Sequence, residues 1–76
     1  MTAKEAIKDV MWEKRYTQKK LAEQLGLVQT AVSNVVNRGS KEPRVDTVVR
    51  FIEAMGCEVI IRDPSTGKEW YITCED

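Results

Sequence analysis

The stretch from Gln18 to Asn37 constrains the fold most, because it predicts two short helices joined by a tight turn. Each helix has one apolar face. These faces consist of Leu21, Ala22 and Leu25, and then of Val32, Val35 and Val36. The small side chain of Ala22 allows the second helix to cross closely, and Gly26 tolerates the positive φ that such a turn requires. The sequence therefore predicts a helix-turn-helix pair that packs face to face.

The second helix of this pair also has a polar face with short hydrogen-bonding side chains. They are Gln29, Thr30, Ser33, Asn34 and Asn37. Side chains of this type suit hydrogen bonding to base edges in the major groove of DNA. We therefore expect a DNA-reading surface here. The alternative is an ordinary solvated helix face.

The charge of the chain is unevenly distributed. Formal net charge is zero, which by itself argues mildly against a nucleic-acid partner. Residues 14–50, however, hold eight basic residues against three acidic ones, a balance of +5, whereas residues 51–76 sum to −4. Such a field can attract phosphate on one face and repel it on the other. The candidate phosphate contacts are Lys19, Lys20, Arg38 and Lys41.

The rest of the chain predicts two more helices and a hairpin, all within one domain of 76 residues. Thr2 with Glu5 forms a capping-box signature, and Thr17 is a good N-cap for the next helix. The expected helices span residues 3–15, 18–25, 28 or 29–37, and 45–55. The predicted fold class is therefore mainly α, with a helical bundle over residues 1–56 and a C-terminal β-hairpin over residues 57–76.

The hairpin has one register that gathers its apolar residues on a single face. With residues 64–67 as the loop, the opposed pairs are Arg62 and Glu69, Ile61 and Trp70, Ile60 and Tyr71, Val59 and Ile72, and Cys57 and Cys74. We expect the apolar face to pack on the first and fourth helices. The free edge is expected to pair with a second subunit. The predicted dimer interface consists of Val59, Ile60, Trp70, Tyr71 and Ile72. The alternative is a hairpin that only caps the monomer core.

Composition argues against several other functions. There is no histidine and there are two cysteines, so we expect no metal site and no cofactor. No nucleophile, base and orienting group occur together, so an enzyme is not expected. No apolar run approaches about 18 residues, and we expect a cytoplasmic protein without a membrane partner. Cys57 and Cys74 are expected as paired buried thiols, with a redox switch as the alternative.

Residues 7–56 resemble the lambda-repressor-like, Cro/C1-type helix-turn-helix family, also called the XRE family. The resemblance rests on three segments: residues 16–27 (YTQKKLAEQLGL), residues 29–33 (QTAVS), and Pro43 followed by DTVV at 46–49 and EAMG at 53–56. It covers about two-thirds of the chain. It implies a four-helix lambda-repressor-like domain that binds double-stranded DNA. It also implies a bacterial or phage transcriptional repressor, which acts as a homodimer on a palindromic operator.

The resemblance also assigns roles to single residues. Gln18 occupies the place where the family's glutamine donates to a backbone phosphate. Gln29 corresponds to a residue that often reads adenine with the support of the other glutamine. Thr30 and Ser33 would face the groove, and Asn34 would stand where the family varies its specificity. The loop after the third helix would meet the DNA backbone through Asn37, Arg38, Ser40 and Lys41.

Two departures from the family pattern matter. Many members pair an arginine in the first helix with a glutamate near the end of the third. Met11 and Val36 occupy these places here, so both charges are replaced by apolar residues and no buried charge is left unpaired. The loop after the third helix is one residue longer, Asn37-Arg38-Gly39, which changes the setting of its backbone contacts.

Two other functions compete with a simple repressor. The acidic C-terminal region, from Glu53 onward, suggests an antitoxin that binds DNA and also a toxin protein. The neutral net charge suggests a protein–protein module that has lost DNA binding.

Overall fold

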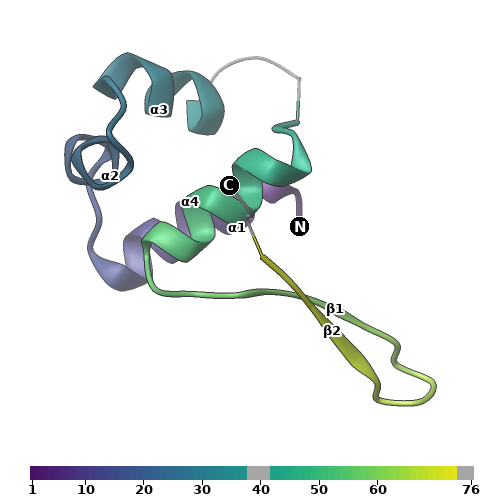
Figure 1. The fold of residues 1–76 in the computed structure, drawn as a ribbon. Coiled ribbons are helices and arrows are strands. Elements are labelled where there is room, and N and C mark those ends of the chain that lie inside the picture. Colours follow the sequence, from purple (N-terminus) through teal and green to yellow (C-terminus); the bar gives the residue numbers. More distant parts are fainter. Residues whose placement is uncertain (38–41, 74–76) are drawn as a thin grey trace.

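The computed structural model describes residues 1–37 and 42–73. The described elements are α1 (Ala3–Lys14), α2 (Gln18–Leu25), α3 (Gln29–Asn37), α4 (Val45–Ala54), β1 (Val59–Arg62) and β2 (Glu69–Ile72). The helices form a bundle, and the two-stranded antiparallel hairpin projects from it (Figure 1). The predicted mainly α fold with a C-terminal hairpin is confirmed.

The first two helices begin where their capping residues predicted. The Thr2 hydroxyl oxygen accepts the Glu5 N–H at 3.2 Å. The Thr17 hydroxyl oxygen accepts the Lys20 N–H at 3.0 Å. Each bond satisfies one of the amide groups that a helix leaves without a carbonyl partner in its first turn.

The helices α1, α2 and α4 end in the same way, with a left-handed residue followed by a bond back to the helix. The left-handed residues are Arg15 (φ 59°), Gly26 (φ 70°) and Gly56 (φ 80°). The closing N–H to carbonyl bonds join Tyr16 to Met11 (2.8 Å), Leu27 to Ala22 (2.9 Å) and Cys57 to Ile52 (3.1 Å). This six-to-one bond is the Schellman arrangement, in which the left-handed position favours glycine. Two glycines occupy it as predicted, whereas α1 uses an arginine.

The core lies between the four helices. Its buried members are Ile7, Met11, Leu21, Ala22, Val32, Val36, Phe51, Ile52 and Met55. Met11 is 8% exposed and Val36 is 2% exposed, so the places of the family's ion pair lie inside this apolar cluster. The structure thus agrees with the expectation that apolar residues replace both charges without disrupting the bundle.

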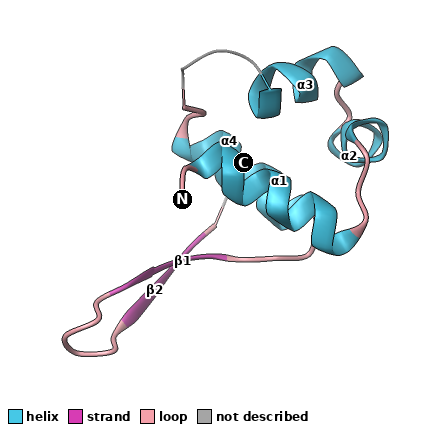
Figure 2. Cartoon of the chain, turned by 180° about the vertical axis from the view of Figure 1, so that it is seen from behind, coloured by secondary structure: helices cyan, strands magenta, loops and turns pink. Residues whose placement is uncertain are grey.

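The hairpin has the predicted register. Val59 pairs with Ile72, Ile60 with Tyr71, Ile61 with Trp70, and Arg62 with Glu69. Its packing differs from the prediction, however. Cys57 and Val59 pack against the core, but Ile61 is 53% exposed and Trp70 is 47% exposed. The strands run outward past the helices (Figure 2), so the helices cover only the base of the apolar face. The expectation that the apolar face packs along α1 and α4 was therefore wrong for its outer half.

Two further expectations concern the cysteines and membrane-spanning helices. Cys57 is half-buried as a free thiol. Its predicted partner Cys74 lies outside the described residues. Within the described part of the chain, no helix is both long and apolar enough to cross a membrane.

Candidate nucleic-acid interface

The helices α2 and α3 lie on the side of the bundle away from the hairpin, and two opposite views agree on this placement (Figures 1 and 2). Their inner faces contribute Leu21, Ala22, Val32 and Val36 to the core. Burial of these residues fixes how the two helices cross, because changes of even one methylene are felt in a packed core. The polar face of α3 is therefore held on a rigid support at the surface.

Four of the predicted DNA-reading residues line one shared concavity between α2 and α3. They are Gln18, Gln29, Thr30 and Ser33, and the open space between them measures about 300 Å³. Gln18 is the first residue of α2, whereas the other three belong to the first turns of α3. Gln18 is thus brought beside three residues that lie 11 or more positions farther along the chain. Every side chain that lines the concavity carries a hydrogen-bonding group and none carries a charge.

Farther along α3, two asparagines continue the polar face. Asn34 is exposed and lies outside the concavity. Asn37 is exposed, and its Nδ2 donates to the Ser33 Oγ at 3.3 Å. The Ser33 hydroxyl is thereby linked to the last turn of α3. Three other predicted contact residues, Arg38, Ser40 and Lys41, lie outside the described residues.

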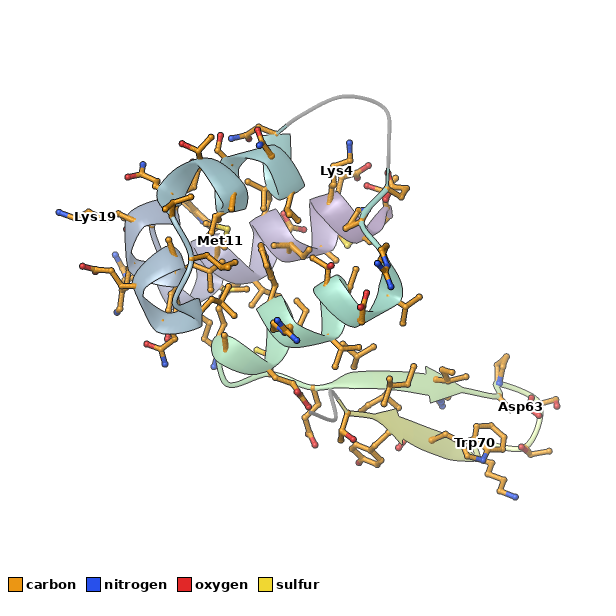
Figure 3. All side chains as sticks on the ribbon, turned by 45° about the horizontal axis from the view of Figure 1, so that its top comes forward. Lys4, Met11, Lys19, Asp63 and Trp70 are labelled. Atoms are coloured by element: carbon orange, nitrogen blue, oxygen red, sulfur yellow. The ribbon has the colours of Figure 1, made fainter. Side chains whose placement is uncertain are left out.

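The basic residues near this surface differ in how they are held. Lys19 is exposed and extends away from the start of α2 (Figure 3). The Nζ of Lys20 lies 4.6 Å from the centre of the Tyr16 ring, a cation–π contact that restrains it. Arg44, the residue before α4, pairs with Asp46 at 3.4 Å, and both side chains are strongly exposed. Lys19 therefore extends into solvent, whereas Lys20 is restrained by an aromatic ring.

The predicted dimer residues fall into two groups. Val59 and Ile72 are half-buried at the base of the hairpin. Ile60, Trp70 and Tyr71 are 40%, 47% and 58% exposed in its outer part. The interface prediction omitted Ile61, although the alternation of the strand places it on the same face as Trp70. The exposed residues thus lie on both faces of the hairpin, with Ile60 and Tyr71 on one face and Trp70 on the other.

Two exposed tryptophan side chains differ in their surroundings. Trp12 on α1 is 84% exposed, so it does not cover the edge of the core. The Nζ of Lys68 lies 5.2 Å from the centre of the Trp70 ring near the hairpin turn. This contact gives the exposed ring a cationic neighbour.

The hairpin turn is held by an acidic side chain. The Asp63 carboxylate accepts the Ser65 hydroxyl at 2.7 Å and the Ser65 N–H at 3.0 Å. These bonds favour the ionised form and lower the pKa of Asp63 below its ordinary value of 3.8. Among the described residues, no cluster of three or more histidine, cysteine or acidic side chains could hold a metal ion.

Two short helices that are joined by a tight turn at Gly26 and packed on a shared core form a helix-turn-helix pair. A protein-family model described as a helix-turn-helix domain matches residues 2–62. The chain therefore belongs to this helix-turn-helix family, which is of the Cro/C1 type. No curated protein and no solved structure matches it. Membership implies a DNA-binding domain, in a family that is typically not enzymatic.

Proposed function

We propose that this protein binds double-stranded DNA at a specific sequence and regulates transcription, with α3 in the major groove. The observation that carries this proposal is the concavity shared by Gln18, Gln29, Thr30 and Ser33. It presents four hydrogen-bonding side chains on a rigid, exposed helix pair. Uncharged donors and acceptors of this kind suit hydrogen bonding to base edges in the major groove.

Within this proposal, Gln29 is the main base-reading residue. A glutamine can donate to N7 and accept from N6 of one adenine, and this bidentate pair discriminates by about 1–3 kcal/mol. Gln18 lines the same concavity, so its amide can hold the Gln29 amide in the reading orientation. Thr30 and Ser33 then reach neighbouring base pairs or their sugars.

Phosphate contacts fix the register of the helix on the duplex. The first amide groups of α2 have no carbonyl partner inside the helix, and the helix dipole is positive at this end. Gln18 opens this helix, and Lys19 extends from it into solvent. We assign one backbone phosphate to this end of α2, with further contacts from Arg38 and Lys41.

The regulator acts as a homodimer on a palindromic operator in our proposal, with its hairpin as the contact between subunits. Its exposed outer half supports this role, because Ile60 is an exposed apolar side chain on a strand edge that a second copy can pair with. Two recognition helices would then enter successive major grooves about 34 Å apart.

Selection of bound duplexes from a random pool, followed by titration of the best site, tests the proposal. The affinity should fall linearly on a log–log plot as salt rises, because phosphate neutralisation releases counterions. Gln29→Ala and Gln18→Ala should weaken binding to the selected site. Gln24→Ala is the matched control, since Gln24 is an exposed glutamine of α2 outside the concavity. If no sequence is enriched, or if affinity is independent of salt, the proposal is wrong.

A second candidate keeps the DNA binding and adds a toxin protein as partner, as in an antitoxin. The exposed hairpin supports it, because an unrelated protein can cover apolar strands as well as a second copy can. Co-purification with the product of a neighbouring gene, lost when residues 57–76 are deleted, distinguishes the two. A hairpin occupied by a second copy would give a homodimer without that product.

A further inference from the structure

We propose that two copies of this chain join through the free edge of β1, antiparallel and centred on Ile60, with Glu58 of each copy opposite Arg62 of the other. The proposal rests on the homodimer proposed above and specifies its edge, register and charge pairs. Three observations carry it: the direction of the backbone groups, the order of charges along β1, and the exposure of the hairpin.

The hydrogen bonds at the turn show which residues of β1 can pair outward. The Asp63 N–H donates to the Lys68 carbonyl at 2.8 Å. Backbone groups alternate in direction along an antiparallel strand, so those of residues 63, 61 and 59 point toward β2. Those of Glu58, Ile60 and Arg62 therefore point to the free edge. Pairing about Ile60 joins these outward groups to each other in both copies.

The charges along β1 favour this one register. With Ile60 opposite itself, each Glu58 faces an Arg62, and Val59 faces Ile61. A shift centred on Val59 would set Glu58 against Ile60, and a shift centred on Ile61 would set Arg62 against Ile60. Larger shifts set Glu58 against Glu58 or Arg62 against Arg62. Opposite charges across strands stabilise a sheet and like charges destabilise it, so the register about Ile60 is self-complementary.

The edge of β2 has no such register. The same alternation points the backbone groups of Glu69, Tyr71 and Thr73 outward. Antiparallel pairing of two copies sets Glu69 against Glu69, Tyr71 or Thr73, and none of these pairs joins opposite charges. The free edge of β1 is therefore the better self-complementary surface.

In the resulting four-stranded sheet, Ile60 of each copy gains an apolar neighbour across the new seam. Ile60 already faces Tyr71 across its own hairpin, so a row of Tyr71, Ile60, Ile60 and Tyr71 forms across the dimer. The second face carries Ile61 and Trp70, and its base packs on the helices through Val59. A two-fold axis perpendicular to the sheet keeps both helical bundles on the same side. Both α3 helices then lie on the side away from the hairpins (Figure 1).

Charge reversal tests the register by sedimentation equilibrium without DNA. Glu58→Arg should weaken the homodimer roughly tenfold, since two attractive pairs become repulsive. The complementary chain carries Arg62→Glu together with Glu69→Lys, which preserves the pairing of residues 62 and 69 within the hairpin. This chain should also dimerise weakly. Mixing the two chains should restore a dimer of normal stability, because each position 58 then faces an opposite charge at position 62.

A matched control separates position from net charge. Glu23→Arg makes the same change of charge on the exposed surface of α2, and it should leave the homodimer unchanged. Circular dichroism should show the same helix content for every chain. If the two complementary variants do not prefer each other over themselves, the register is wrong.

Crosslinking gives a second test that does not depend on charge. Residue 60 faces itself in this register, at a Cα separation of about 5.5 Å that a disulfide can span. In a chain with Cys57→Ser and Cys74→Ser, Ile60→Cys should form a crosslinked dimer in mild oxidant. Ile61→Cys should not, because its copies would lie two residues apart along the strands. Equal crosslinking of both, or of neither, would overturn the proposal.

These tests fail separately from the test of DNA binding. A monomer in sedimentation that still selects a DNA sequence would refute the β1 contact and leave the reading role of α3 intact. A dimer with the predicted exchange and crosslinks that selects no DNA would support the β1 contact and refute the proposed function.

Discussion

Arg15→Gly should stabilise the protein, although it removes a charged side chain and adds no contact. Arg15 is the residue after α1, at φ 59° and ψ 41°, and it is the one non-glycine residue with positive φ among the described residues. This conformation costs an L-residue about 1–2 kcal/mol, because its Cβ crowds the next carbonyl. Glycine avoids that cost but loses more backbone freedom on folding, about 0.5–1 kcal/mol. The difference between these ranges is about 0–1.5 kcal/mol, so the expected net gain in the free energy of unfolding is about 0.75 kcal/mol.

Urea and thermal unfolding measure this gain. A gain of this size raises the midpoint temperature by about 2–8 °C in a domain of this length. The backbone bond from Tyr16 to Met11 stays in place, because it involves no side chain. Arg15→Ala should give no such gain, since alanine keeps the strain and loses only the guanidinium. Gly26→Ala should destabilise by about 1 kcal/mol, as its Cβ would meet no atom within 4 Å and the cost lies in the backbone alone.

The outcome decides whether backbone strain or side-chain charge matters at this helix end. Equal effects of Arg15→Gly and Arg15→Ala would show that removal of the charge is responsible. A lower stability of Arg15→Gly would refute the argument from the left-handed conformation.

Three further predictions follow from the core, the turn and the basic surface. Met11→Arg should lower the free energy of unfolding, measured in urea, by about 3–5 kcal/mol, because it buries an unpaired charge. Val36→Glu in the same chain should recover part of this loss. If it recovers nothing, the two positions are not coupled. The Asp63 carboxyl has a lowered pKa in the folded hairpin, chiefly because the Ser65 hydroxyl donates to it. The stability that this carboxylate contributes to the folded state is therefore present above pH 3.8 and is lost as the pH falls through the folded pKa. Ser65→Ala should move the NMR titration midpoint of Asp63 upward toward its ordinary value, and an unchanged midpoint would exclude the hydroxyl as the cause. Lys19→Gln should weaken DNA binding equally for all sequences and reduce the salt slope by about 1, whereas a loss confined to one sequence would contradict a phosphate contact.

Much of the helical framework could be predicted because its signals are local. Hydroxyls of Thr2 and Thr17 compete well for the first amide groups of a helix, so they mark where α1 and α2 begin. Gly26 and Gly56 mark helix ends, since the left-handed position suits a residue without Cβ. Arg15 shows the limit of this reasoning. The sequence predicts that α1 ends near Arg15, but no property of arginine predicts a left-handed conformation.

The register and the packing of the hairpin illustrate the same contrast. Alternation along β1 and β2 fixed the register correctly, because a slip of one residue would scatter the apolar side chains over both faces. How far the helices cover the hairpin depends instead on where α4 ends in space and on the direction of residues 57–58. No local pattern contains this information, so the exposure of Ile61 and Trp70 was missed.

The candidate site could be predicted in part, because it depends both on a local motif and on how two helices pack. The family resemblance paired Gln18 with Gln29, and their concavity depends on the crossing of α2 and α3. Packing around Ala22 sets that crossing, so a motif that specifies the packing also specifies the site. The sequence analysis does not predict the cation–π contact between Lys20 and Tyr16, although residues four positions apart can meet on one face of a helix.

The most direct test of the central claim measures the coupling between Gln29 and a single base pair. The operator found by selection is changed one adenine at a time, and the affinity of the native chain, Gln29→Ala and Gln24→Ala is measured for each duplex at one salt concentration. At one adenine in each half-site, the native chain and Gln24→Ala should lose about 1–3 kcal/mol on base change, while Gln29→Ala should lose almost nothing further. If Gln29→Ala keeps the same preference at every position as the native chain, α3 does not read DNA through Gln29 and the account is wrong.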